Sequence, residues 1–294
     1  MLKFATFCFG SLLSFAAAAN PLPQTSPPEH HALWSLQGKS NTVYLLGSVH
    51  FLRPSDQLPD AVDDAYRNAG KLVMELDMDD LDPATTQQTT LDLGLLPDNK
   101  TLESELGRAA YLKVARQARS IGLDLAVLNH FRPWLAAMTL VQLQLVKQGL
   151  DPASGVEQRL VARAAADHKE IIGLETLQGQ LGLLANLPQQ QQREFLMYSV
   201  DDADRADQEI EELITAWRNG DTHALEQILA AGFEKYPDLY RPLTVERNRK
   251  WIPDIEKLLD DKDDYLVVVG TMHLVGKDSV IDLLESSGHK VTQH

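Results

Sequence analysis

The sequence predicts an α/β fold in which a mixed, largely parallel sheet is split along the chain by a long helical insertion. Residues 42–77 have the pattern of strand, helix and strand, a βαβ unit that implies a parallel pair. Residues from about 81 to 260 are almost all helical by their apolar period. Residues 264–293 return to strand, helix and strand, so both ends of the chain are expected to supply one sheet.

Turn and cap residues define the elements before the insertion. "ALWSLQ" and "TVYLLG" are apolar runs separated by "GKSN", which predicts a hairpin. A helix is predicted over 58–70, because Pro59 suits a first helical turn and Gly70 suits a helix end. "KLVMELD", at 71–77, is predicted to be the strand that completes the βαβ unit.

The predicted insertion contains several helices and one short strand, "EIIG" at 170–173. Clear examples of the helical period are "RAAYLKVARQARSIG", "PWLAAMTLVQLQLVKQG" and "VEQRLVARAAADH". Because the insertion lies between strands, we expect it to form either a lid over a site or an oligomer surface. Its sequence pattern does not choose between these two roles.

The first residues are predicted to direct export. Lys3 precedes an apolar run that ends in "AAAA", so residues 1–19 have the form of a cleaved signal peptide. A membrane anchor is the alternative, although the run is short for a span. Residues 20–31 carry four prolines and are expected to be a disordered leader. We then expect a single domain over 32–294, in a periplasmic or secreted protein with no stable membrane insertion after cleavage.

Composition limits the partners of the mature chain. Removing Lys3 leaves 26 basic residues (27 minus one) against 42 acidic ones, which is a net charge of −16. This charge argues against nucleic acid and anionic membranes as partners, and is compatible with a peptide or small-molecule substrate. Cys8 is the one cysteine and lies in the predicted signal peptide, so disulfides and cysteine ligands are excluded from the mature chain.

The pattern Gly-x-x-His occurs three times. "YLLGSVH" ends at His50 and "VVVGTMH" ends at His273, each after an apolar run typical of a buried strand. Each glycine allows a sharp turn or a close backbone approach, and both histidines are expected at the carboxyl edge of a parallel sheet, where α/β proteins build sites. The alternative is a pair of hydrogen-bonded histidines under a loop. In the third copy, Gly220 and Asp221 are predicted to cap two helices, which makes His223 a surface residue.

Carboxylates are predicted at the same edge. Glu75 and Asp77 end one strand on a common face, and Glu175 follows the short strand of the insertion. Burying an unpaired charge costs on the order of several kcal/mol, so we expect these groups to have partners. The alternative is that Glu75 and Glu175 begin loops and face water. Two histidines with one or two carboxylates suit a divalent metal such as Mn, Co or Zn, which would activate a bound water.

Arg247 and Asn248 begin a predicted amphipathic helix, "TVERNRKWIPDIEKLL". At a helix start they could supply a cation and amide donors to a developing oxyanion. The alternative is that both are solvated surface residues. The apolar stripe of this helix is predicted to consist of Ile252, Ile255, Leu258 and Leu259.

Eight segments, taken in order, resemble the TraB/PrgY/GumN family. They are "YLLGSVH", "VMELD", "RPWLAA", "GVEQRLVARA", "GLETLQGQLGLL", "AWRNGDTHAL", "ERNRKWIPDI" and "VVVGTMHLVGKDSVIDLLESSGHKV". The resemblance extends from about Leu33 to Val291. It implies a fold shared with erythromycin-esterase-like and ChaN-like proteins. The animal relatives called TIKI are described as metal-dependent proteases, which implies a metallohydrolase here.

The resemblance also implies site residues, with two departures. Paired Gly-x-x-His motifs and a glutamate correspond to His50, His273 and Glu75, supported by Glu175, Arg247 and Asn248. The family often has Gly-Ile-Asp where this chain has Gly155-Val156-Glu157, which puts a role for Glu157 in doubt. It also often has a small residue where Met272 stands, and Met272 could narrow the space beside His273.

The sequence therefore predicts an exported metallohydrolase that cleaves a peptide or related acyl bond. The predicted metal ligands are His50, Glu75 and His273. Glu175 is expected to be the general base or a fourth ligand, Arg247 to hold the oxyanion or a substrate carboxylate, and Asn248 to contribute to the cofactor site.

Two other functions stay open. One is a binding protein without turnover, for a haem-like cofactor, a peptide signal or a metal. The other is metal-free ester hydrolysis, in which a histidine activates water directly. The chain contains neither "HExxH" nor "GxSxG", which argues against the commonest zinc-protease and serine-hydrolase mechanisms.

Overall fold

A computed structural model describes residues 30–201, 206–234 and 237–294. The predicted signal peptide and most of the predicted leader lie outside the described residues. The chain divides into two compact units, and each is described by itself. Unit 1 consists of His50–Asp56 and Met74–Asp207; unit 2 consists of the described residues before His50, together with Gln57–Val73 and Gln208–His294.

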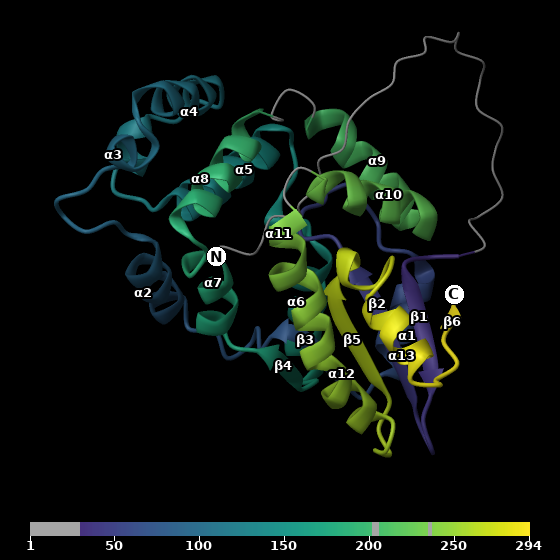
Figure 1. The fold of residues 1–294 in the computed structure, drawn as a ribbon. Coiled ribbons are helices and arrows are strands. Elements are labelled where there is room, and N and C mark those ends of the chain that lie inside the picture. Colours follow the sequence, from purple (N-terminus) through teal and green to yellow (C-terminus); the bar gives the residue numbers. More distant parts are fainter. Residues whose placement is uncertain (1–29, 202–205, 235–236) are drawn as a thin grey trace, which may run out of the picture. The chain divides into compact units, whose positions relative to one another are not determined.

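Six strands form a mixed sheet in the order β4-β3-β5-β2-β1-β6 (Figure 1). They are β1 (Leu33–Gln37), β2 (Thr42–Ser48), β3 (Lys71–Leu76), β4 (Ile171–Glu175), β5 (Tyr265–Gly270) and β6 (Thr292–Gln293). The predicted hairpin is confirmed, because β1 and β2 are antiparallel neighbours. β6 is antiparallel to β1, whereas β2 and β5 run parallel. The prediction of a mixed α/β sheet interrupted in sequence by helices is thus confirmed.

One expectation about the sheet is wrong. The two strands of the βαβ unit, β2 and β3, are not neighbours, because β5 lies between them. Residues Tyr265–Val269 of β5 are all buried, and β5 pairs with β2 from Val43↔Tyr265 to Ser48↔Gly270. A strand with so continuous an apolar run is stabilised most at the centre of a sheet, and strands adjacent in sequence are neighbours only about two-thirds of the time.

Unit 1 is mainly helical. Its elements besides the strands are α2 (Pro83–Gly94), α3 (Leu102–Leu106), α4 (Arg108–Ser120), η1 (Leu125–Leu128), α5 (Pro133–Lys147), η2 (Pro152–Ser154), α6 (Val156–Asp167), α7 (Leu177–Ala185) and α8 (Gln189–Asp201). α5 packs against α8, and α8 also packs against α4. Trp134, Phe195 and Leu196 are buried in this helical core, which matches the amphipathic periods of the insertion.

Unit 2 contains strands β1, β2, β5 and β6. Its helices and helical turns are α1 (Asp60–Asn68), α10 (Thr222–Phe233), α11 (Pro237–Tyr240), the π-helical turn η3 (Arg241–Val245), α12 (Glu246–Leu258), the 3₁₀ turn η4 (Thr271–His273) and α13 (Val280–Ser286). α9 (Ala206–Arg218) crosses the boundary between the units. α1 packs against β5, and α12 packs against α13 (Figure 1).

The glycine of the first Gly-x-x-His motif permits a close backbone approach, as predicted. A Cβ on Gly47 would lie 3.1 Å from the Cα of Thr271, which directly follows β5. Trp217 Nε1 donates to the Gly47 carbonyl oxygen at 2.6 Å, and Thr271 Oγ1 donates to the carbonyl oxygen of Ser48 at 2.9 Å. These contacts hold the carboxyl ends of β2 and β5 side by side within unit 2.

The third Gly-x-x-His copy is a helix–helix junction, as predicted. Gly220 has a left-handed φ of 58°, and Asp221 caps α10 by accepting from the backbone N–H of Ala224 at 2.9 Å. His223 is exposed and its Nε2 contacts the side chain of Gln227 at 3.0 Å. His223 is therefore a suitable surface control for the other two histidines.

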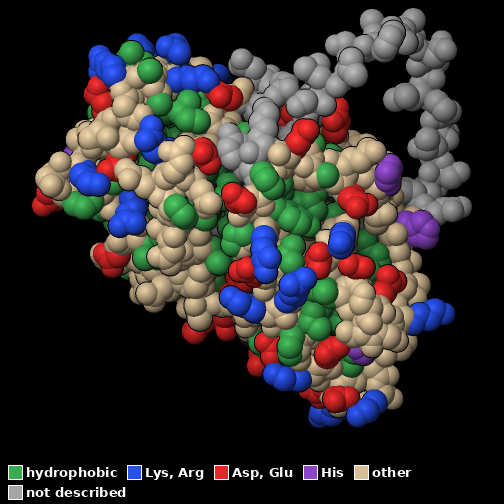
Figure 2. All heavy atoms as spheres, viewed as in Figure 1, with side chains coloured by type: hydrophobic (Ala, Val, Ile, Leu, Met, Phe, Trp, Pro, Cys, Tyr) green, Lys and Arg blue, Asp and Glu red, His purple; other side chains and the backbone are tan. Residues whose placement is uncertain are grey.

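The described end of the predicted leader is part of unit 2. His31 hydrogen-bonds through Nδ1 to the carbonyl oxygen of Arg218 at 3.0 Å, and its backbone N–H donates to the carbonyl oxygen of His294. Figure 2 shows Lys and Arg side chains interspersed with Asp and Glu on the visible face. Within the described ranges, none of the helices combines the length and the apolar character needed to cross a membrane.

The hydrogen bond between Tyr265 and Asp261 is expected to stabilise the fold at neutral pH and to lose this effect in acid. Its hydroxyl donates to Asp261 Oδ2 at 2.6 Å, and this bond is the main reason why the pKa of Asp261 lies below its usual 3.8. A carboxyl whose pKa is lowered by folding stabilises the fold above pH 3.8, and this contribution is lost as pH falls through the folded-state pKa. Tyr265→Phe should therefore be less stable than the parent at neutral pH, by a difference that shrinks in acid.

Urea unfolding followed by circular dichroism, at pH values on both sides of 3.8, measures this difference. Tyr111→Phe, on α4, is the matched control for loss of a hydroxyl elsewhere. A Tyr265→Phe deficit that stays constant or grows as the pH falls would contradict the linkage.

Candidate functional site

His50 lies two residues after β2 and pairs with a carboxylate of the helical insertion. Its Nδ1 contacts Glu157 Oε1, and the two side chains are only 12% and 10% exposed. Glu157 stands in the first turn of α6, where the helix dipole favours a negative charge. Gly155, just before α6, lies against His50, because a Cβ at that position would overlap the His50 carbonyl oxygen. The start of α6 therefore places a carboxylate on His50.

The segment that carries His50 is attached to the same part of unit 1 along its length. Arg159 of α6 donates to the carbonyl oxygens of Asp56 at 2.6 Å and Arg53 at 3.3 Å. The backbone N–H of Asp151 donates to the carbonyl oxygen of Leu52 at 2.9 Å. These bonds make residues 50–56 part of unit 1, and they fix the position of His50 relative to Glu157.

Glu75 is a partnered carboxylate within β3. Its Oε2 accepts a hydrogen bond from Gln180 Nε2 of α7 at 2.8 Å, and Gln180 is buried. This arrangement excludes the alternative in which Glu75 begins a loop and simply faces water. Glu175 is the last residue of β4 and is half-buried.

Asp77 directly follows β3 and has a perturbed acidity. Burial, a hydrogen bond with Asp79 and the charges of Asp79 and Asp80 together raise its pKa from 3.8 to about 6. The backbone of Asp77 is closely approached by Gly173 of β4, so this turn is tightly packed. Unit 1 thus holds a carboxyl with a raised pKa next to the end of β3.

The second histidine, His273, lies in η4 directly after β5 and is buried in unit 2. Its Nδ1 is 2.6 Å from Asn248 Oδ1, and its Nε2 is 3.0 Å from Arg247 Nη1. The exposed fractions of His273, Arg247 and Asn248 are 6%, 5% and 0%. The interpretation of Arg247 and Asn248 as solvated surface residues is therefore wrong.

Trp251 completes this buried cluster. Its ring centroid lies 4.5 Å from that of His273, with the rings tilted by 51°. The Arg247 guanidinium carbon lies 4.8 Å from the Trp251 ring centroid, which is within range of a cation–π contact. Hereafter, the His273 cluster means Arg247, Asn248, Trp251 and His273.

The buried face of α12 differs from the predicted apolar stripe. Ile255 is fully buried and Leu259 is buried just after the helix, but Ile252 and Leu258 are only half-buried. The face toward the core carries Arg247, Asn248, Trp251 and Ile255, which follow one another at helical spacing. The prediction failed because Arg247 and Asn248, although polar, are buried by contacts with other elements.

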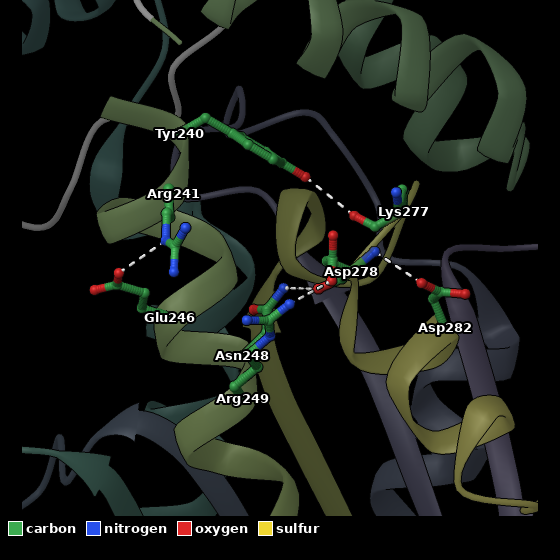
Figure 3. Close-up of polar contacts among 8 residues, drawn as sticks. All are labelled: Tyr240, Arg241, Glu246, Asn248, Arg249, Lys277, Asp278 and Asp282. Carbon is green, nitrogen blue, oxygen red and sulfur yellow. Dashed lines mark hydrogen bonds and ion pairs between the residues drawn. The ribbon is translucent and has the colours of Figure 1, made fainter. Parts of the chain in front are cut away.

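The loop after η4 is attached to α12 and α11 (Figure 3). Asn248 Nδ2 donates to the carbonyl oxygen of Asp278 at 2.8 Å, and Arg249 Nη2 contacts Asp278 Oδ1 at 2.9 Å. The Tyr240 hydroxyl donates to the carbonyl oxygen of Lys277 at 3.2 Å. Burial raises the pKa of Tyr240, and the charges of Asp278 and Glu226 add to this effect.

The structure groups the predicted residues into separate sets. Arg247, Asn248 and His273 are in direct contact in unit 2, whereas His50 and Glu75 belong to unit 1 and each has its own polar partner. A metal site that joins His50, Glu75 and His273 therefore stays a prediction. Across the described ranges, no three or more His, Asp or Glu side chains are grouped so that they could hold a metal ion.

Three contacting residues were not identified from the sequence as parts of a site. The "GVEQ" segment signals a helix start with an acidic first turn, so Glu157 had a local signal, but nothing local indicated that it contacts His50. Gln180 and Trp251 had no signal beyond helical periodicity. Each of these three residues joins its site through a contact with a residue from another element of the chain.

The donor groups fit a metal ion in unit 1 better than in unit 2. A metal-binding histidine usually has a carboxylate beside its other ring nitrogen, and Glu157 Oε1 is in ion-pair contact with Nδ1 of His50. Gln180 is a comparable partner for the Glu75 carboxylate. At His273, by contrast, Nε2 faces the Arg247 guanidinium and Nδ1 faces Asn248, so this arrangement does not fit a cation on either nitrogen.

Comparisons with known proteins identify relatives over most of the chain. The model of the TraB/PrgY/gumN family matches residues 32–293. "Uncharacterized protein YbaP" of Escherichia coli (strain K12) is 23% identical over 255 residues, covering 82% of this chain and 87% of that protein. "Uncharacterized protein" of Treponema pallidum (strain Nichols) is 25% identical over 168 residues, covering 56% of this chain and 49% of that protein. No solved structure matches the chain significantly.

Proposed function

The chain belongs to the TraB/PrgY/gumN family, and we propose that it is an exported hydrolase that cleaves a peptide or related acyl bond with the help of a divalent metal ion. The observation that carries this proposal is the nearly buried pair of His50 and Glu157. The apolar run of residues 1–19 supports export to the periplasm or the medium. Mn, Co and Zn are the proposed metals.

His50 is the proposed proton-handling or ligand residue. A carboxylate against Nδ1 favours the tautomer with the proton on Nδ1, which puts the lone pair of the ring on Nε2. Nε2 is then the atom that takes a proton from water or binds a metal, and Glu157 stabilises the imidazolium formed in the first case. Because both side chains are almost buried, their interaction is stronger than it would be in water.

His50 and Glu75 are the residues of unit 1 that would hold the metal ion. A bound divalent ion would supply a more acidic water and a Lewis acid for the acyl oxygen. Glu157 and Gln180 would orient these two ligands. Glu175 remains the proposed general base or further ligand, and Arg247, supported by Asn248, the proposed group for an oxyanion or a substrate carboxylate.

A binding protein without turnover is the second candidate. The His273 cluster is compatible with it, because both ring nitrogens of the histidine contact side chains of the same helix. Such a histidine has a structural partner at each nitrogen and does not by itself indicate catalysis. A haem-like ligand would show a visible absorption band, whereas a hydrolase would show turnover.

Metal content tests the proposed cofactor. Mature protein incubated with Mn, Co or Zn and then desalted should retain one of these ions, as measured by mass spectrometry. His50→Ala should lose the ion, because a ligand is removed, and Glu75→Gln should bind it about 10- to 100-fold more weakly, because a neutral amide replaces the charged carboxylate. His223→Ala, which changes an exposed Gly-x-x-His histidine, should bind like the parent.

Turnover of fluorogenic peptide and ester libraries tests the reaction. We expect cleavage that stops with chelator and returns when the retained metal is added back. Cleavage that persists in chelator would replace the metal mechanism with direct activation of water by histidine. No cleavage by any metal form would remove the hydrolase proposal and favour the binding protein.

A further inference from the structure

We infer that His273 is a positioning residue for Arg247, held as a neutral imidazole with its proton on Nδ1, and not a metal ligand. This differs from the role that the Gly-x-x-His pattern predicts for it. The assignment of the tautomer stands on contacts within unit 2 alone. Only the effect on turnover rests on the proposed function.

The chain of contacts begins at a backbone carbonyl. The Asp278 carbonyl oxygen can only accept a hydrogen bond, so the Asn248 atom 2.8 Å from it must be the amide nitrogen. This settles the orientation of the Asn248 amide, which contacts alone do not always settle. Asn248 Oδ1 is therefore the atom that faces His273.

The orientation of Asn248 determines the tautomer of His273. An amide oxygen only accepts, so the His273 Nδ1 at 2.6 Å from Asn248 Oδ1 must carry a proton. Arg247 only donates, and its Nη1 lies 3.0 Å from His273 Nε2. Nε2 must then be the unprotonated acceptor. Every contact from Asp278 to Arg247 has a donor and an acceptor only when His273 is neutral and protonated on Nδ1.

Arg247 is held by several contacts in this position. Its Nη1 also donates to the Leu243 carbonyl oxygen at 3.3 Å, and its guanidinium lies over the Trp251 ring. A metal ion on Nε2 would take the lone pair that Arg247 uses and would stand next to a buried positive charge. To admit the metal, Arg247 would have to leave His273 and the face of Trp251.

Asp278, where this series of contacts begins, is itself held in place by neighbouring side chains (Figure 3). Asp278 has a positive φ of 57°, which is uncommon for a residue with a side chain. The Asp278 backbone N–H donates to Asp282 Oδ2 at 2.8 Å, and Arg249 holds the Asp278 side chain. These contacts maintain the unusual backbone conformation and set the direction of the Asp278 carbonyl.

The consequence is a polar relay from the Asp278 loop through Asn248 and His273 to Arg247. It orients a guanidinium, whose planar set of donors matches a carboxylate or an acyl oxygen. Within the proposed function, Arg247 is the group proposed for an oxyanion or a substrate carboxylate, and His273 acts through it.

Nitrogen NMR of the histidine rings tests the inference directly. In ¹⁵N-histidine protein at neutral pH, His273 should show the Nδ1-protonated tautomer, and its two nitrogen shifts should stay unchanged when Zn is added. The His273 signals are assigned by their loss in His273→Gln or, if that variant does not fold, by their displacement in Asn248→Ser. A Zn-dependent shift of His273 Nε2, or a proton found on Nε2, would overturn the inference whether or not the protein is a hydrolase.

Two matched substitutions separate the roles further. Glutamine at position 273 offers an oxygen that can reach Arg247, whereas asparagine offers an amide only at the position of Nδ1. His273→Gln should keep the parent's Zn content and lose less than about tenfold in kcat/KM, whereas His273→Asn should lose about 100-fold, because Arg247 is no longer held in place. Loss of Zn in both variants, with His223→Ala unchanged, would instead make His273 a ligand.

Discussion

His50→Ala is expected to lower kcat/KM for the substrate found in the library screen by about 100- to 10,000-fold, because it removes the group that handles the proton or holds the metal. Glu157→Gln is expected to lower kcat/KM by about 10- to 100-fold, because the amide replaces the carboxylate that orients His50. The double variant should be no worse than His50→Ala, since Glu157 acts only through His50.

The control for this cycle is Glu105→Gln. Glu105 is also a buried glutamate of unit 1, and it pairs with Lys100 at 2.9 Å and with Gln189. Its substitution should lower stability and leave kcat/KM unchanged. If Glu157→Gln behaves like Glu105→Gln, or if the losses from His50→Ala and Glu157→Gln multiply in the double variant, then the two residues do not act as a unit.

Gly155→Ala is expected to destabilise unit 1 by about 1–3 kcal/mol, because the new Cβ would overlap the His50 carbonyl oxygen and the backbone must move. Gly155 is also the residue that caps α6, a position where alanine is disfavoured relative to glycine. The displacement involves the backbone of His50 itself, so kcat/KM should fall together with stability. Urea unfolding and the hydrolysis assay measure the two effects.

Gly182→Ala, in the same unit, is the matched control. Gly182 lies inside α7, and a Cβ there would meet only the Asn186 side-chain nitrogen, at 3.4 Å. Because alanine favours a helix interior, this change should stabilise by up to about 1 kcal/mol. Equal stability and activity for Gly155→Ala and the parent would show that the close approach of Gly155 to His50 does not hold in solution.

Much of the secondary structure could be predicted because its causes are local. The β1–β2 hairpin follows from two apolar runs and a short polar turn, and the junction at Gly220 and Asp221 follows from residues that favour helix ends. The positions of His50 and His273 after apolar strands were predictable for the same reason. Strand order was not, because it depends on the total burial of β5 between β2 and β3.

The sequence by itself determined the α/β class, the helical insertion and the presence of a histidine after each of two strands. Only the tertiary structure decided what those histidines contact: Glu157 for His50, and Arg247 and Asn248 for His273. Periodicity and capping depend on residues a few positions apart, so one sequence can reveal them. The partner of a buried polar group is set by packing between distant segments, where the cost of leaving the group unpaired selects the contact.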